Sequence, residues 1–230
     1  MALGALAARF AAVQGRIAAA AARAGRDPAE VRLVAVTKGH PLAVAQEARA
    51  AGLEDLGENR VQEALAKMDA WPLAPVRWHL VGHLQRNKAR HVVGRFALVH
   101  SLDSRRLADA MEEAAAARGV VQEVLVEVNV AGETQKTGCP PSEVAALVEH
   151  ASRLTHLRVR GLMTMAPYTD AVAVQRRAFA GLRELRSRLA ALGYRLDDLS
   201  MGMTNDFEVA VEEGATMVRL GTALFGERTA

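Results

Sequence analysis

The sequence predicts an α/β fold, a single closed (β/α)8 barrel of the TIM type, and three observations lead to this prediction. Short β-branched apolar runs alternate with longer Ala-, Leu- and Arg-rich stretches of helical spacing, and eight such pairs follow one another. Alternating strands and helices form a parallel sheet, and eight pairs can close it into a barrel. No Pro-, Gly- or Ser-rich linker interrupts the chain, so residues 1–230 are expected to form one domain. An open doubly wound sheet is the alternative, although no G-x-G-x-x-G pattern follows the first strand.

The N-terminal half is expected to hold an extra helix and the first four strand–helix pairs. Residues 1–23 have helical spacing, and Gly25, Asp27 and Pro28 end this helix. Each expected strand is a short apolar run that stops at polar residues or glycine, and these strands are 31–37, 55–59, 76–81 and 97–100. The expected helices are 42–51, 60–70, 84–92 and a helix to Arg118 that begins with Asp103 as its cap.

The C-terminal half repeats the same alternation of short apolar strands and longer helices. Its expected strands are 123–129, 159–163, 198–201 and 217–220. Its expected helices are 142–153, 171–192, 206–213 and a last short helix after Gly221. Because the carboxyl ends of barrel strands carry the active site in this fold, the residues that follow these strands are the candidates for chemistry.

Composition excludes several classes of protein. Half of the residues are hydrophobic, which excludes a disordered chain, and the single cysteine, Cys139, excludes a disulfide scaffold and suggests a reducing cytoplasm. Neither a signal peptide nor a membrane span is expected, because arginines interrupt the apolar N-terminal stretch. A net charge of +3 makes a poor case for nucleic acid, and we interpret the basic stretch 86–95 as a solvated helix face. No metal is expected.

Lys38 is the first candidate for chemistry. It ends the most apolar strand and precedes Gly39. Partial desolvation there would lower the pKa of its amine and make it a nucleophile able to form a Schiff base with a carbonyl. The alternative is a lysine whose side chain reaches solvent from a strand end.

The last two strand ends predict a phosphate site. Loops after the seventh and eighth strands often hold a phosphate in barrels of this kind. Gly221 would let the backbone approach an anion, and Ser200 and Thr222 would offer hydroxyls. The alternative is that these residues only cap the final helix.

A nucleophilic lysine and a phosphate site together suggest pyridoxal 5′-phosphate (PLP) as cofactor. Arg219 lies two residues before Gly221 and could face the pyridine nitrogen, where its permanent charge would disfavour protonation of the ring. The alternative is a buried structural arginine paired with a carboxylate.

The sequence resembles the pyridoxal phosphate homeostasis proteins, which are similar to the barrel domain of alanine racemase and have PLP fold type III. The motifs that carry the resemblance are VAVTK (34–38), GENRVQE (57–63), WHLVGHLQRNK (78–88), GLMTM (161–165), LSMGMTND (199–206) and VRLGTALFG (218–226). The resemblance covers the whole chain. It implies a Schiff base at Lys38, phosphate contacts from Ser200, Gly221 and Thr222, and Arg219 near the pyridine nitrogen. It places Asn59, Met163 and Met201 around the cofactor and makes Lys136 a candidate for transient contact.

For function, the resemblance implies a cytoplasmic PLP carrier in vitamin B6 homeostasis without established catalytic turnover. PLP-dependent apo-enzymes are its expected recipients, and a monomer is its expected state. A lone-barrel amino-acid racemase is the alternative, but a two-base racemase needs a second acid/base. Tyr168 and Tyr194 lie outside the predicted strand ends, which leaves His79, His83 or His100 as candidate bases. A third hypothesis is a nucleic-acid or protein adaptor that uses the stretch 86–95.

Overall fold

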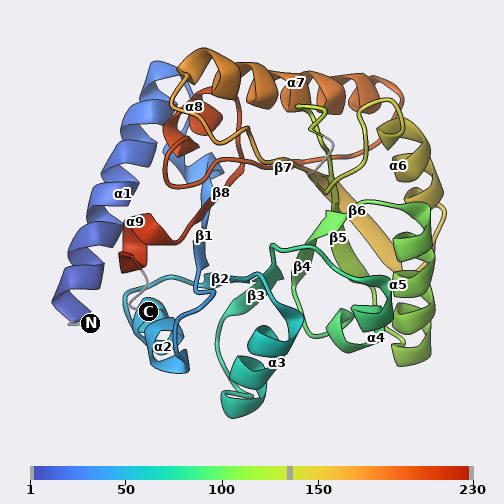
Figure 1. The fold of residues 1–230 in the computed structure, drawn as a ribbon, viewed down its shortest axis with the longest axis horizontal. Coiled ribbons are helices and arrows are strands. Elements are labelled where there is room, and N and C mark those ends of the chain that lie inside the picture. The colour runs from blue at the N-terminus through green and yellow to red at the C-terminus, as the bar shows by residue number, and fades with distance from the viewer. Residues whose placement is uncertain (1–2, 134–136, 228–230) are drawn as a thin grey trace.

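Eight parallel strands close into a barrel in the computed structural model, which describes residues 3–133 and 137–227 (Figure 1). Each strand pairs with its neighbours in chain order, and β8 pairs with β1, so that Val34 lies opposite Arg219. The strands are β1 (Arg32–Val36), β2 (Asp55–Glu58), β3 (Arg77–Leu80), β4 (Leu98–Leu102), β5 (Gln122–Glu127), β6 (Leu157–Met163), β7 (Asp198–Ser200) and β8 (Met217–Leu220). The predicted (β/α)8 barrel is confirmed.

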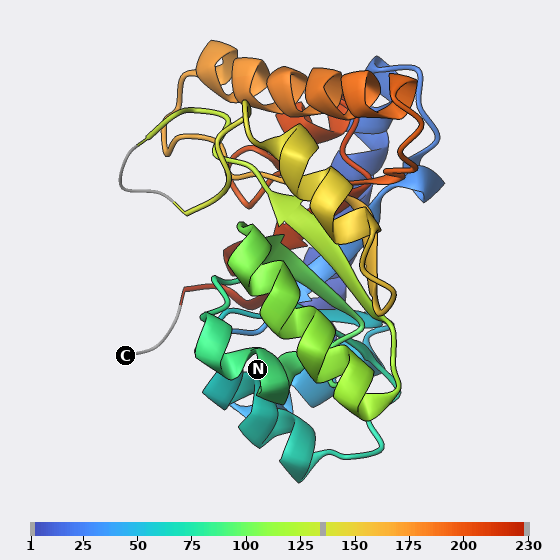
Figure 2. The same cartoon turned by 90° about the vertical axis from the view of Figure 1, so that its right-hand side faces the viewer.

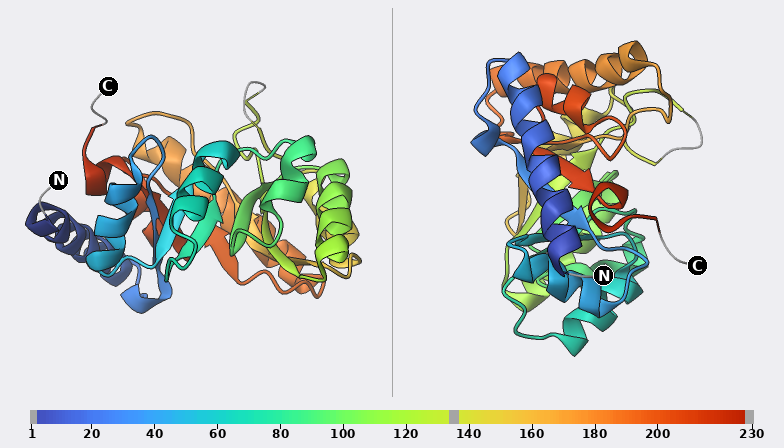
Figure 3. Two further views of the ribbon diagram at one scale, coloured as in Figure 1. Left: turned by 90° about the horizontal axis from the view of Figure 1, so that it is seen from below. Right: turned by 90° about the vertical axis from the view of Figure 1, so that its left-hand side faces the viewer.

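Helices cover the outside of the barrel (Figures 1 and 2). They are α1 (Leu3–Arg23), α2 (Leu42–Ala50), α3 (Val61–Ala70), α4 (Ala89–Val92), α5 (Arg105–Arg118), α6 (Val144–Ser152), α7 (Val172–Ala191), α8 (Phe207–Glu212) and α9 (Thr222–Phe225). The extra N-terminal helix α1 lies beside α8 and α9 (Figure 3, right), where Arg16 forms an ion pair with Glu208. None of the helices within the described ranges is long and apolar enough to cross a bilayer.

Two of the predicted elements differ from the structure. The expected helix 84–92 is a 3₁₀ turn, Arg86–Lys88, followed by the short α4, and the chain turns at Gly94 with a positive φ of 76°. The helix α5 is capped by Ser104 and not by Asp103. The Ser104 hydroxyl accepts a hydrogen bond from the Leu107 N–H, three residues on, which is the usual capping geometry. Asp103 instead lies 3.4 Å from the Nδ1 atom of His83.

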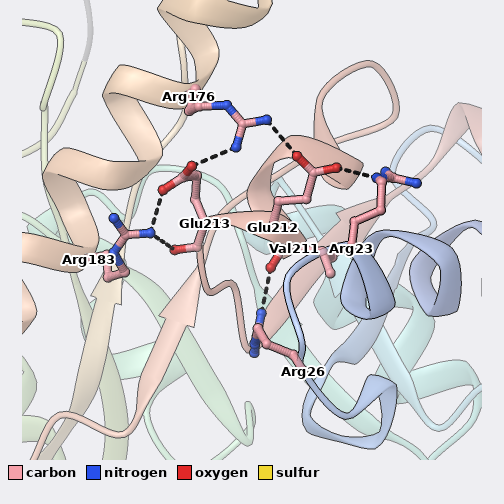
Figure 4. Close-up of polar contacts among 7 residues, drawn as sticks. All are labelled: Arg23, Arg26, Arg176, Arg183, Val211, Glu212 and Glu213. Atoms are coloured by element: carbon pink, nitrogen blue, oxygen red, sulfur yellow. Dashed lines mark hydrogen bonds and ion pairs between the residues drawn. The ribbon is translucent and has the colours of Figure 1, made fainter.

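A cluster of ion pairs joins α8 to its two neighbours (Figure 4). Glu212 accepts hydrogen bonds from Arg23 of α1 at 2.7 Å and from Arg176 of α7 at 2.5 Å. Glu213, at the end of α8, accepts from Arg176 and Arg183, both on α7. Isolated surface ion pairs stabilise little, but several charges that share partners hold a geometry better. The cluster therefore fixes α8, and with it the loop 201–206 that runs from β7 into α8.

The interior of the barrel has an apolar layer and a polar layer. Leu98, Leu125, Met163 and Met217 form a small cluster of buried side chains inside the barrel, apart from the large core between strands and helices. Polar groups from β2, β3, β4, β7 and β8 form hydrogen bonds across the rest of the interior. Buried polar groups need partners, so this layer links strands that are not neighbours in the sheet.

Candidate functional site

A cavity of about 520 Å³ opens at the carboxyl ends of the strands. It is lined by five of the residues that the sequence singled out, which are Lys38, Asn59, Arg219, Gly221 and Thr222. These residues come from the ends of β1, β2 and β8, which are neighbours in the sheet. Because parallel strands present their carboxyl ends on one face, the barrel brings them together. The volume lies within the range of small-molecule and cofactor sites, about 300–1,000 Å³.

Lys38 is held through its backbone neighbours. The ammonium group of Lys67 donates to the Thr37 carbonyl oxygen at 2.8 Å, and the Gly39 N–H donates to the carboxylate of Glu63. Gly39 has a φ of 72°, a conformation that favours glycine. Lys38 itself is exposed and lines the cavity.

A buried ion pair lies beneath this turn. Lys67 and Glu58 are both buried, and their charged atoms lie 2.6 Å apart. The Thr37 hydroxyl donates to the same Glu58 oxygen at 2.5 Å. Burial raises the pKa of Glu58, although hydrogen bonds from Lys67 and Thr37 act in the opposite direction. Within the described chain, the second oxygen of Glu58 is buried without a hydrogen-bond partner. This pair was not predicted, although Glu58 lies in the GENRVQE motif and Lys67 is four residues after Glu63.

Asn59 lines the cavity from the end of β2 and is half-buried. The chain passes close to it at Gly82, after β3. A Cβ atom at Gly82 would lie 2.2 Å from the Asn59 carbonyl oxygen, which no side chain could tolerate. Glycine at position 82 therefore permits the close approach of the two strand ends that places Asn59 at the cavity.

Arg219 is buried but reaches the cavity lining. One terminal nitrogen donates to the Ser200 hydroxyl at 2.6 Å, and the other donates to the Thr164 carbonyl oxygen at 3.0 Å. Burial lowers the pKa of the guanidinium to about 10, while Asp206 and Glu127 act in the opposite direction. The group is therefore a cation at neutral pH. Its direct hydrogen bonds are to a hydroxyl and a carbonyl, rather than the carboxylate pairing that was the alternative.

Ser200, Met163 and Met201 are fully buried and do not belong to the cavity lining. The Ser200 hydroxyl lies inside the barrel, 2.6 Å from the nearest Arg219 nitrogen and 2.9 Å from Nδ1 of His100. Its contact with a phosphate stays a prediction.

Thr204 also lines the cavity, as Thr222 and Gly221 do. Its Oγ1 atom accepts a hydrogen bond from the Ala223 N–H at 3.3 Å, which joins the loop after β7 to the segment after β8. Asp206 holds the same loop, since its carboxylate accepts from the Met203 N–H at 2.5 Å. Thr204 stands in the LSMGMTND motif, and the signal for it is a second hydroxyl residue two positions after Gly202.

The candidate acid/base residues divide into two groups. Tyr168 lines the cavity and is 93% exposed, whereas the sequence placed it away from the site. His79 and His100 are buried inside the barrel, and neither they nor His83 belong to the cavity lining. Lys136 lies outside the described residues.

The fold and the cavity define a (β/α)8 barrel with an exposed lysine, a buried arginine and three threonines, Thr169, Thr204 and Thr222, around one pocket. Residues 9–229 match the family described as "Alanine racemase, N-terminal domain". The pyridoxal phosphate homeostasis protein of Pseudomonas aeruginosa is 48% identical over 223 residues, which cover 97% of this chain and 96% of that protein. The protein of the same name from Aquifex aeolicus is 45% identical over 221 residues, with coverage of 96% and 97%.

A solved structure gives the same picture. PipY of Synechococcus elongatus, with PLP bound, has a TM-score of 0.83 and 38% identity, and the match covers 96% of this chain and 100% of that chain. The chain therefore belongs to the family of pyridoxal phosphate homeostasis proteins, within the alanine racemase N-terminal domain family.

Proposed function

We propose that this chain binds PLP as a Schiff base on Lys38 and serves vitamin B6 homeostasis without catalytic turnover. The observation that carries the proposal is that one cavity brings together Lys38, Arg219 and the hydroxyls of Thr204 and Thr222. These groups fit the three recognisable parts of PLP, which are an aldehyde, a pyridine nitrogen and a phosphate. The names of the relatives and the PLP-bound PipY structure support the same choice of ligand.

Each residue has a separate task in this proposal. Lys38 supplies the amine that condenses with the aldehyde and releases water. Arg219 donates a hydrogen bond to the pyridine nitrogen, and its positive charge keeps that nitrogen unprotonated. Thr204 and Thr222 donate to the phosphate, and Gly221 lets the backbone approach it. Asn59 borders the cofactor from the end of β2. When bound, PLP supplies a reactive aldehyde that the protein stores.

The first test is the visible absorbance of the purified protein with added PLP, before and after borohydride reduction. We expect a band that disappears on reduction and a peptide map with the adduct on Lys38. The variant Lys38→Ala should lose this band, whereas Lys88→Ala should keep it, because Lys88 contacts Gln62 outside the cavity. An unchanged spectrum and affinity in Lys38→Ala would refute the assignment.

A racemase working as a lone barrel is the second candidate, and one observation favours it. Tyr168 lines the cavity at its exposed side and has the chemistry of an acid/base. The test is exchange of the α-proton of free amino acids into solvent deuterium, across a broad panel. Exchange above that of free PLP, lost in Tyr168→Phe, would establish the racemase and overturn the carrier. Exchange at the level of free PLP would remove the racemase.

Three further features belong to the proposal. We expect PLP-dependent apo-enzymes to receive the cofactor, which activation of such an apo-enzyme by the loaded protein would test. A monomer is expected in solution, and analytical ultracentrifugation would test it. The cytoplasmic location rests on the single thiol of Cys139, which is buried, and fractionation of cells would test it.

A further inference from the structure

A row of polar side chains crosses the barrel interior beneath the cavity. Asp55, His79, His100, Ser200 and Arg219 come from five different strands, and all five residues are buried. The Nε2 atom of His79 lies 2.8 Å from an Asp55 oxygen, and its Nδ1 atom lies 2.9 Å from Nε2 of His100. The Nδ1 atom of His100 lies 2.9 Å from the Ser200 hydroxyl, which lies 2.6 Å from Arg219. The row is therefore continuous from Asp55 to the cavity.

The two ends of the row fix the direction of its hydrogen bonds. Arg219 can only donate. Burial alone would raise the pKa of Asp55, but hydrogen bonds from Arg77 and His79 hold it far below its ordinary 3.8, so the carboxylate can only accept. Nε2 of His79 must therefore carry a proton and donate to Asp55.

Only one placement of the protons on His79, His100 and Ser200 gives every group of the row a hydrogen-bond partner. If both rings are neutral, Nδ1 of His79 accepts from Nε2–H of His100, and Nδ1 of His100 accepts from the Ser200 hydroxyl. Ser200 in turn accepts from Arg219, and no donor or acceptor of the row is left over. If His79 carries a second proton, His100 must donate to Ser200. The buried Ser200 hydroxyl then accepts twice and has no acceptor for its own hydrogen among its contacts in the described chain.

The charges around His100 favour the same arrangement. Burial, together with the charges of Arg219 and Arg32, lowers the pKa of His100 well below its ordinary 6.5. A protonated ring would place another cation inside a barrel that already holds the buried Arg219.

We infer that Asp55, His79, His100 and Ser200 are positioning residues for Arg219, joined in one hydrogen-bond relay in which both histidines carry their proton on Nε2. The relay and the Thr164 carbonyl engage two of the guanidinium N–H groups from within the barrel. The other donors of Arg219, which lines the cavity, are thereby held in place for a ligand. For the identity of that ligand, the inference rests on the proposed function.

The first test needs no cofactor. Long-range ¹H–¹⁵N spectra of protein with labelled histidine report the charge and tautomer of each of the seven rings. At neutral pH we expect the signals of two neutral rings with the proton on Nε2. Each signal is assigned to its residue because it disappears in His79→Gln or in His100→Gln. A cationic ring at either position, or an Nδ1–H tautomer at His100, would overturn the relay.

The second test measures PLP binding through the relay. Ser200→Ala leaves Arg219 and His100 without their shared partner, and we expect PLP affinity to fall about tenfold, with a shift in the absorbance maximum of the bound cofactor. Ser200→Thr keeps the hydroxyl and should restore both. His91→Ala is the matched control, because His91 is exposed and contacts only its neighbour Arg90 among the hydrogen bonds assigned to it.

The far end of the relay distinguishes positioning from simple packing. Asp55→Asn changes no cavity residue, yet it should weaken PLP binding in the same direction as Ser200→Ala and alter the His79 signal. Circular dichroism shows whether each variant is folded, and Asp55→Asn carries the test if Ser200→Ala is not. Unchanged binding and spectra in the folded variants would overturn the inference. Failure of the unmodified protein to bind PLP would instead refute the proposed function, and the histidine spectra alone would then decide the relay.

Discussion

Two residues at the cavity, Lys38 and Arg219, are held by opposite means. Beneath Lys38, the contacts go to the backbone. Lys67, which is paired with Glu58, donates to the carbonyl of residue 37, and Glu63 accepts from the N–H of residue 39. Lys38 itself stays exposed. Beneath Arg219, the contacts go to the side chain itself, from Ser200 and the Thr164 carbonyl, and the residue is buried. The first support uses charge and the second uses a directed row of hydrogen bonds.

The difference follows from what each residue has to do. A lysine that captures an aldehyde needs a fixed starting point and a side chain that can reach, since four rotatable bonds give it that range. An arginine that recognises one atom of a ligand needs a fixed fork, because its donors act only at the correct angle. The support beneath Lys38 is therefore suited to the capture of an aldehyde, and the support beneath Arg219 to the recognition of one ligand atom.

The largest effect should come from breaking the support beneath Lys38. Lys67→Met removes the buried cation and leaves Glu58 buried without its ion-pair partner, and we expect the free energy of unfolding to fall by about 3–5 kcal/mol. Urea denaturation measures this loss. Lys88→Met is the control, since Lys88 makes a single hydrogen bond to Gln62 on an exposed site and should change stability little. A loss no larger than that of the control would mean that the ion pair does not support the turn.

The two supports should also respond to pH with opposite sign. The pKa of Asp55 is lowered from 3.8, so its contribution to stability is present above pH 3.8 and is lost as the pH falls below it. The pKa of Glu58 is raised from 4.5, so its contribution to stability is present below pH 4.5 and is lost as the pH rises above 4.5 through the raised pKa. Each pKa unit corresponds to about 1.4 kcal/mol.

Unfolding free energies measured below pH 3.8 and above pH 4.5 test whether stability changes with pH in these two directions. Relative to the unmodified protein, Asp55→Asn should remove part of the stability loss at acid pH. Glu58→Gln should remove part of the loss of stability that occurs as the pH rises above 4.5. This change in slope is expected whether the variant is more or less stable than the unmodified protein at any one pH. The same slope in both variants would contradict the contrast between the two supports.

A smaller effect is expected for the fork of Arg219. Arg219→Lys keeps a positive charge but cannot reach both Ser200 and the Thr164 carbonyl with one planar group, so PLP affinity should fall about ten- to hundredfold. A titration followed by absorbance measures it. Arg195→Lys serves as the control, because Arg195 is exposed and does not belong to the cavity lining. Equal affinities in the two variants would leave Arg219 without a role in recognition.

The smallest effect should come from the two hydroxyls of the phosphate side. Thr204→Val and Thr222→Val keep the shape of the side chain and remove one donor each, which corresponds to about 1 kcal/mol, or several-fold in PLP affinity. Binding of pyridoxal, which has no phosphate, should stay unchanged. Weaker binding of both molecules would indicate a change in the shape of the cavity instead of a lost phosphate contact.

Much of the fold and part of the site could be predicted from the sequence. Periodicity gave the strands, and the strand ends gave Lys38, Asn59, Arg219, Gly221 and Thr222, because a residue at the carboxyl end of a parallel strand faces the cavity. Helix ends were less predictable, since Ser104 and Asp103 are both good caps and only the hydrogen bond to Leu107 distinguishes them.

The positions of the remaining residues depend on contacts between segments that are far apart in the sequence, and one segment alone does not reveal these contacts. Neighbouring residues of a strand point to opposite faces, so the place of the Ser200 side chain depends on the register of β7 in the barrel. Its partners, His100 and Arg219, come from β4 and β8. The role of Lys67 likewise depends on how α3 packs against β2, which brings its ammonium group to Glu58.

The buried ion pair of Lys67 has a consequence for chemical selectivity. The chain contains four lysines among 29 basic residues, so most of its positive charge is carried by guanidinium groups, which are much poorer than amines at condensing with aldehydes. Of the lysines that the structure describes, Lys67 is buried and hydrogen-bonded to Glu58 and the Thr37 carbonyl, and Lys88 does not belong to the cavity lining. Among the lysines that the structure describes, Lys38 is therefore the one whose amine an aldehyde can meet within this cavity.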